Sequence, residues 1–173
     1  RVIYYRSIFS IVSTILAILA FEKFNAAEYS IQDFNNGTIF DWLFTISLCF
    51  FSFFGLYYYT NALKIGRYGF VTPFVSTASI FSFLTAILFF NEEVSIYNLS
   101  SFGLLIVGIL YHQKDQLKDF RLNKEILLSL LCAFFWGVSF VLYLIPIKKF
   151  GVLNFSLILE VCVFLSAMGI LIF

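Results

Sequence analysis

Residues Trp42–Leu63 read WLFTISLCFFSFFGLYYYTNAL, a stretch in which no side chain carries a full charge at neutral pH. A helix needs about 20 consecutive apolar residues to cross the hydrocarbon core of a bilayer. The stretch has that length, and its apolar residues are continuous rather than alternating, which favours a helix over a membrane strand. It therefore predicts a membrane-spanning helix.

Similar stretches flank it on both sides, and the composition of the whole chain agrees with them. The chain is 61% hydrophobic and 12% charged, with a mean hydropathy of +0.96, which leaves too little polar surface to cover a soluble globule. We predict an all-α integral membrane protein, a multi-span helical bundle with about six transmembrane helices. The expected helices are Val2–Phe21, Trp42–Leu63, Phe70–Phe90, Ile96–Tyr111, Ile126–Ile147 and Val152–Phe173.

The charged and metal-binding residue types exclude several other functions. The net charge is +1 and the cations lie in loops or at span ends, so we expect the lipid bilayer as a partner and no nucleic acid. Cys49, Cys132 and Cys162 lie inside apolar stretches without metal-ligand spacing, which indicates buried, inert thiols and no metal site. With no Walker loop either, we expect no cofactor.

Motifs along the chain resemble a known family in their order and spacing. They comprise Arg6 before the first long helix, Ala62, Leu63, Gly66 and Pro73, Glu92 at a helix end, Gly103 and Gly108 in the next helix, and then Leu130, Ala133, Trp136 and Gly137 in the stretch LLCAFFWGVSF. This pattern resembles the EamA-like permeases of the drug/metabolite transporter superfamily. The resemblance covers nearly the whole chain.

The resemblance implies a particular organisation. The chain would supply helices two to seven of an inverted-repeat transporter with ten helices: residues 1–112 the remainder of the first EamA-like repeat, 113–125 the connector, and 126–173 the start of the second repeat. The start at Arg1 without methionine and the end at Phe173 inside an apolar run also lead us to expect part of a longer protein. Positively charged residues place the connector in the cytoplasm, whereas the family places it outside, so the orientation stays open.

The resemblance also marks residues with structural roles, namely Arg6, Pro73, Glu92, Gly103, Gly108 and Gly137. Glu92 would accept hydrogen bonds from a neighbouring helix N-terminus and fix a loop. Pro73 can be tolerated in the first turn of its helix. Members of the family often carry a second proline where this chain has Ser79, so we expect no kink at that position.

Glu160 is the one ionisable side chain several residues inside an expected span. A charge there costs about 2.5–3.5 kcal/mol on insertion scales, so it normally has a partner or a function. One interpretation is a carboxylate that couples transport to protons or contacts substrate. The alternative is a side chain near the interface that extends its charge towards water.

Other polar and aromatic residues are candidates for a substrate path. Asn61 needs a partner in lipid, so we expect it to face the bundle or a water-filled cavity. The remaining candidates are Tyr59, Ser76, Ser79 and Trp136. Packing between helices is the alternative role for the two serines and for Trp136, and an interfacial belt is the alternative for the tyrosine.

The function most consistent with these features is secondary transport of a small metabolite by alternating access at the cell membrane, as a permease or exporter, and not an enzyme. A non-transporting scaffold or an oligomeric membrane protein, including a homodimer, is the alternative, because small-residue faces serve packing equally well. An intramembrane lipid-modifying enzyme is the third interpretation, although the single histidine and the lack of a catalytic motif argue against it.

Overall fold

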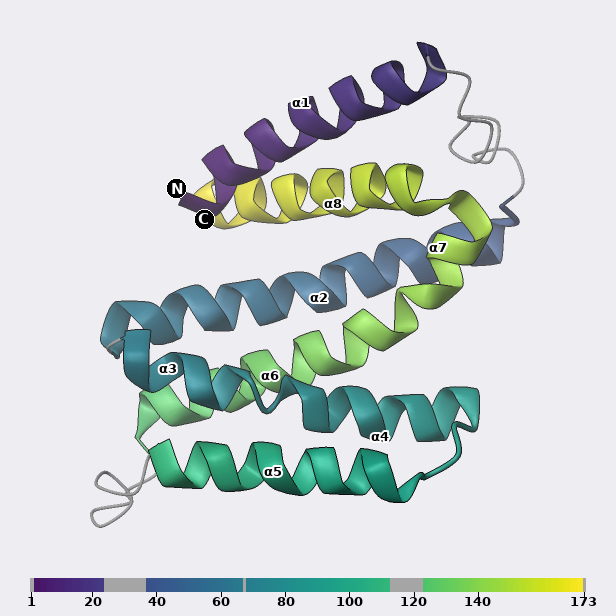
Figure 1. The fold of residues 1–173 in the computed structure, drawn as a ribbon. Coiled ribbons are helices and arrows are strands. Elements are labelled where there is room, and N and C mark those ends of the chain that lie inside the picture. Colours follow the sequence, from purple (N-terminus) through teal and green to yellow (C-terminus); the bar gives the residue numbers. More distant parts are fainter. Residues whose placement is uncertain (1, 24–36, 67, 113–122, 173) are drawn as a thin grey trace. The chain divides into compact units, whose positions relative to one another are not determined.

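The computed structural model describes residues 2–23, 37–66, 68–112 and 123–172, and every regular element in these ranges is a helix (Figure 1). The helices are α1 (Val2–Lys23), α2 (Ile39–Ile65), α3 (Tyr68–Val75), α4 (Ala78–Phe90), α5 (Ile96–His112), α6 (Lys124–Leu142), α7 (Leu144–Phe150) and α8 (Val152–Ile172). Most of the predicted connector, residues 113–122, lies outside the described residues.

The described helices have the lengths and composition of membrane spans. Five stretches are long and apolar enough to cross a bilayer, namely Val2–Ala20, Ile39–Ile65, Val71–Phe90, Lys124–Phe150 and Val152–Ile170. A sixth apolar stretch, Ile96–Gly108 in α5, is shorter. The predicted fold class, an all-α multi-span membrane protein, is confirmed. The three cysteines are free and buried, as expected.

The helix predicted at Phe70–Phe90 is interrupted, which corrects the expectation of one continuous helix, although Val71–Phe90 is still long and apolar enough to form one span. Ser76 and Thr77 separate α3 from α4. Pro73 lies inside α3, not in its first turn, and has no N–H to donate to the carbonyl of Gly69. The N–H of Thr77 donates to the Phe74 carbonyl at 3.2 Å. This bond joins residues three apart, as in a 3₁₀-helix, instead of the four of an α-helix. The break therefore lies at Ser76 and Thr77, and Ser79 itself lies within α4.

The fifth predicted helix, Ile126–Ile147, is also divided. α6 ends at Leu142 and α7 begins at Leu144, with Tyr143 between them. Pro146 explains this position, because its missing N–H leaves the Leu142 carbonyl without the usual helical donor. The next bond is made normally, from the N–H of Ile147 to the Tyr143 carbonyl at 3.0 Å.

The chain divides into two compact units, and the first comprises residues 1–53 and 142–173. Within it α1 and α8 pack along one another (Figure 1). Tyr4 stacks on Phe164 with ring centroids 5.1 Å apart, while Arg6 contacts Glu160. Moving forward along α1 thus corresponds to moving back along α8, so the two helices are antiparallel.

The second unit comprises residues 54–141 and contains α3, α4 and α5 with parts of α2 and α6. Gly137 of α6 lies directly against α4: a Cβ atom added there would stand 2.6 Å from Phe81 Cβ and 3.1 Å from the Ser82 nitrogen. The Ser82 hydroxyl also donates to the Gly137 carbonyl at 2.9 Å. The missing side chain of Gly137 therefore allows the two backbones to approach closely, as small residues do in membrane helices.

In the first unit, α2 begins with reciprocal hydrogen bonds between Thr38 and Asp41. The N–H and the hydroxyl of Thr38 donate to Asp41 Oδ2, each at 2.8 Å, and the Asp41 N–H donates back to Thr38 Oγ1 at 3.3 Å. These bonds satisfy backbone donors that a first helical turn leaves without partners. Lys149 Nζ lies 3.4 Å from the same carboxylate oxygen.

Two substitutions of Asp41 distinguish the stability that its capping bonds with Thr38 contribute from the stability that its ion pair with Lys149 contributes. We expect Asp41→Ala to lower the free energy of unfolding by about 1 kcal/mol, because the acceptor for Thr38 is lost. Asp41→Asn keeps an acceptor oxygen and loses only an exposed ion pair, which contributes less than about 1 kcal/mol. Unfolding in mixed detergent micelles measures both variants, and equal losses would contradict the capping role.

Candidate functional site

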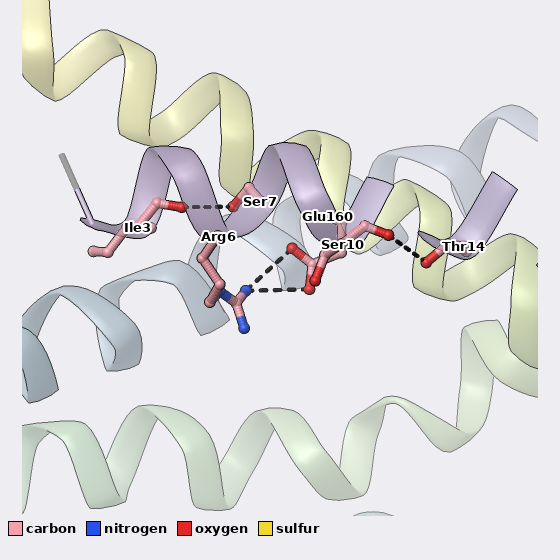
Figure 2. Close-up of polar contacts among 6 residues, drawn as sticks. All are labelled: Ile3, Arg6, Ser7, Ser10, Thr14 and Glu160. Atoms are coloured by element: carbon pink, nitrogen blue, oxygen red, sulfur yellow. Dashed lines mark hydrogen bonds and ion pairs between the residues drawn. The ribbon is translucent and has the colours of Figure 1, made fainter. Parts of the chain in front are cut away.

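Arg6 and Glu160, which lie far apart in the sequence, form an ion pair within the first unit (Figure 2). Nη2 of Arg6 lies 3.1 Å from Oε1 and 3.1 Å from Oε2 of Glu160. Arg6 is near the start of α1 and Glu160 lies within α8, so the pair links two membrane-spanning helices. Each charge therefore has an opposite charge beside it, which offsets the cost of placing it in a span.

The two members of the pair differ in exposure. The Glu160 side chain is 15% exposed, whereas that of Arg6 is 50% exposed. A single guanidinium nitrogen contacts both carboxylate oxygens, so the bond is not the two-nitrogen fork that arginine often forms. Among the described residues, Nη1 and Nε of Arg6 have no hydrogen-bond acceptor. The guanidinium therefore has donors available for a further anionic or polar group.

The surrounding polar side chains of α1 do not compete for this pair. The hydroxyl of Ser7 donates to the Ile3 carbonyl at 3.0 Å, and that of Thr14 donates to the Ser10 carbonyl at 2.9 Å (Figure 2). Both bonds stay within α1. The hydroxyls are thus satisfied by their own helix, and the contact between Arg6 and Glu160 joins α1 to α8 by charge.

Asn61 belongs to the second unit, where it lines a hollow of about 410 Å³. Its Oδ1 accepts a hydrogen bond from Lys64 Nζ at 3.3 Å. The hollow lies between the last turns of α2 and the first turns of α6. The amide is therefore in a polar recess near the end of a span.

Tyr59 and Trp136 contact each other in the same unit, with ring centroids 5.4 Å apart. The indole also lies over Gly55, where an added Cβ atom would stand 2.7 Å from Trp136 Nε1. Phe140 stacks on the indole, one turn further along α6, at 5.8 Å. These contacts pack α2 against α6, and a substrate-binding role for Tyr59 and Trp136 stays a prediction.

Ser76 and Ser79 lie at and just after the interruption between α3 and α4, and both are exposed. The Ser76 hydroxyl donates to the Thr72 carbonyl at 3.1 Å, and the Ser79 N–H donates to the Ser76 carbonyl at 3.3 Å. The Thr77 hydroxyl donates to the Phe74 carbonyl at 2.6 Å. Hydroxyl groups thus satisfy backbone carbonyls at a break within a span, as membrane helices require.

The residues marked by the family resemblance have contrasting surroundings. Glu92 is exposed in the segment after α4, which ends at a left-handed Asn91 with φ 50°. Among the described residues Glu92 makes no hydrogen bond or ion pair, and its structural role stays a prediction. No neighbouring atom of the described residues lies within 4 Å of a Cβ added at Gly103 or Gly108, whereas Gly137 is closely packed.

Sequence reasoning did not single out three lysines that the structure places in polar contacts or recesses. Lys149 pairs with Asp41, and Lys64 and Lys124 line the hollow that contains Asn61. A signal for Lys64 was present, because Tyr57, Asn61, Lys64 and Ile65 recur at helical spacing along α2, whereas nothing comparable pointed to Lys124 on α6. The partner of Glu160 had no local signal, since Arg6 lies 154 positions away.

Comparison with known proteins identifies the family. The sequence model of the EamA-like transporter family matches residues 1–111, which is more than half of the chain. A search of curated proteins and a search of solved structures returned no match. The family match confirms the resemblance over residues 1–111, which include Arg6, whereas the resemblance of residues 126–173 to a second repeat, including Gly137, stays a prediction. The chain belongs to the EamA-like transporter family.

Proposed function

We propose that the protein is a secondary transporter that moves a small metabolite across the cell membrane by alternating access. Family membership supports a membrane permease in general. The observation that carries the finer proposal is the ion pair between Arg6 and Glu160 inside two spans. In this proposal Glu160 takes up a proton during the transport cycle and thereby releases Arg6.

The physical basis is charge balance in a medium of low polarity. An isolated charge within a span costs about 2.5–3.5 kcal/mol on insertion scales, so Arg6 and Glu160 favour contact while both are ionised. A proton on Glu160 removes its charge and leaves the guanidinium without a counter-ion. An acceptor group on the substrate can then replace the carboxylate, using the donors that Arg6 keeps free among the described residues.

The interrupted span supports the same function. Transporters of several folds place their binding sites at discontinuous helices, whose free backbone groups face a cavity. In the second unit α3 and α4 are discontinuous at Ser76 and Thr77, and hydroxyl groups there add hydrogen bonds to the Thr72 and Phe74 carbonyls, which also accept backbone N–H groups. In this proposal residues 113–125 join two inverted repeats, which would rearrange against each other during transport.

Transport by the purified protein tests the proposal directly. Proteoliposomes are incubated with a cell extract of small metabolites under an imposed pH gradient, washed, and analysed by mass spectrometry against protein-free liposomes. One coupled proton contributes about 1.4 kcal/mol per pH unit, so we expect about tenfold accumulation of the transported compound per unit. Glu160→Gln should bring that compound to equal concentrations on both sides and no further.

The control is Glu93→Gln, which removes the same charge at an exposed position between α4 and α5. It should accumulate the compound as the unchanged protein does. If no compound enters through the unchanged protein, transport of a small metabolite is wrong. If Glu160→Gln accumulates the compound to the same extent as Glu93→Gln, the transport proposal stands but the role of Glu160 is wrong.

A further inference from the structure

The hollow lined by Asn61 in the second unit, here called the lysine hollow, is lined among the described residues by several hydrogen-bond donors. It has a volume of about 410 Å³, within the range of small-molecule sites. α2 contributes Tyr57, Tyr58, Asn61, Lys64 and Ile65, and α6 contributes Lys124 and Leu128. Lys64 is in the last turn of α2 and Lys124 in the first turn of α6, so the hollow lies at a span end.

The charge of the lysine hollow is positive. Lys64 and Lys124 are both exposed, and in the described part of the chain neither forms an ion pair with a carboxylate. The nearest acidic residue in sequence, Glu125, does not line the hollow. Its carboxylate lies beside Gly66, with Oε2 2.9 Å from the position of an added Cβ atom there. Among the residues that the structure describes, two ammonium groups thus lie in one recess without a carboxylate in its lining.

The other polar groups also favour an anion. Asn61 Oδ1 is occupied by Lys64, which leaves its amide N–H groups as donors. The hydroxyls of Tyr57 and Tyr58 can donate as well, and their rings meet edge to face at 5.7 Å. Ile65 and Leu128 add an apolar surface beside these donors.

We propose that the lysine hollow binds the phosphate group of a small amphiphile, with Lys64, Lys124 and Asn61 around the phosphate. Two ammonium groups match the charge of a phosphate ester, and the amide N–H supplies a neutral donor to its oxygens. The tyrosine rings, Ile65 and Leu128 contact the apolar part of the ligand. The phosphate can belong to a soluble phosphorylated metabolite or to a phospholipid headgroup, since both reach the end of a span.

Binding of phenyl phosphate to the purified protein in a neutral detergent tests this site. Phenyl phosphate combines a phosphate with a small apolar body, and phenol is the matched probe without the charge. We expect calorimetric binding of phenyl phosphate and none of phenol. Lys64→Gln and Lys124→Gln should each weaken binding by about tenfold, the effect of losing a charged hydrogen-bond donor. Lys148→Gln, which removes an exposed lysine outside the lysine hollow, should leave the affinity unchanged.

Competition then identifies the source of the phosphate. If phosphatidylglycerol added to the micelles displaces phenyl phosphate, and phosphatidylcholine does not, the natural ligand is an anionic lipid. If neither lipid displaces it, the ligand is a soluble phosphate ester. The proposal is overturned if neither phenyl phosphate nor phosphatidylglycerol binds, or if Lys148→Gln weakens binding as much as Lys64→Gln and Lys124→Gln. Binding is measured without transport, so the failure of either proposal leaves the other standing.

Discussion

Replacing Gly137 by alanine should lower the free energy of unfolding of the protein by about 1–3 kcal/mol, the usual cost of overpacking a close contact. The added Cβ atom would meet Phe81 Cβ at 2.6 Å and the Ser82 nitrogen at 3.1 Å, and the carbonyl oxygen of Ala78 is closer still. Two of these three atoms belong to the α4 backbone, which cannot move aside as the end of a side chain can. α4 and α6 must therefore separate, and the hydrogen bond from Ser82 to Gly137 lengthens.

Gly103→Ala is the matched control for this experiment. In the part of the chain that the structure describes, no neighbouring atom lies within 4 Å of an added Cβ atom at Gly103, and alanine favours a helix over glycine by about 1 kcal/mol. We therefore expect Gly103→Ala to be neutral or stabilising. Circular dichroism during unfolding by sodium dodecyl sulfate in mixed micelles measures both. Equal tolerance of alanine at Gly137 and Gly103 would contradict close packing between α4 and α6.

A larger side chain separates steric conflict from loss of flexibility. Gly137→Val should destabilise the protein more than Gly137→Ala, because its branches project further towards Phe81. Gly103→Val meets no such conflict with the described residues. Compared with Gly103→Ala, it should lose only the small difference in helix propensity between alanine and valine. If the free energy of unfolding falls further with valine than with alanine at Gly137, and not at Gly103, contact with α4 is the cause of the destabilisation.

The two glycines also show where sequence reasoning stops. Both lie in apolar helices, yet one adjoins a neighbouring backbone and the other has no neighbouring atom within 4 Å of an added Cβ atom among the described residues. Hydropathy predicts where a span begins and ends because length and apolarity act locally. The spans of α1, α2 and α8 were placed correctly for this reason. The atom opposite a given glycine depends on which helix packs there, and local sequence does not contain that information.

The interrupted helices have a similar explanation. Pro73 and Pro146 are visible in the sequence, and each removes one helical hydrogen bond. Whether a helix then bends or divides depends on the groups that satisfy the freed carbonyls. The carbonyl that Pro73 leaves without a helical donor is that of Gly69, whereas the division occurs further on, at Ser76 and Thr77, whose hydroxyls donate to the Thr72 and Phe74 carbonyls. Both prolines are thus visible in the sequence, and the break at Tyr143 follows from the missing N–H of Pro146, whereas the position of the break after Pro73 does not follow from the proline alone.

The sequence identified one member of the ion pair between Arg6 and Glu160 but not their contact. A carboxylate within a span needs a partner, so Glu160 could be singled out from its position alone. The sequence also contained Arg6, but no spacing rule connects positions 154 residues apart. Their contact requires the antiparallel packing of α1 and α8. A charge exchange between the two positions measures how far that packing depends on the ion pair.

We expect Arg6→Glu to destabilise the protein by about 2–3 kcal/mol, because two carboxylates would then face each other between α1 and α8. This value lies between the 0–1 kcal/mol of an exposed pair and the 3–5 kcal/mol lost when a buried pair is broken. The intermediate estimate follows from the exposures, 50% for Arg6 and 15% for Glu160. Glu160→Arg should be similarly harmful, since it would place two guanidinium groups together.

The double exchange, Arg6→Glu with Glu160→Arg, should recover most of the lost stability, because opposite charges again lie side by side. The coupling energy from the four proteins isolates the interaction between the two positions from the separate effects of each substitution. Asp41→Lys with Lys149→Asp is the matched exchange for the other ion pair of the first unit, whose members are 32% and 42% exposed. Solvent screening should limit its coupling to less than about 1 kcal/mol. A coupling at Arg6 and Glu160 no larger than that of the exposed pair would mean that packing alone holds α1 against α8. A clearly larger coupling would show that the charges themselves specify this contact, as a proton-controlled switch at Glu160 requires.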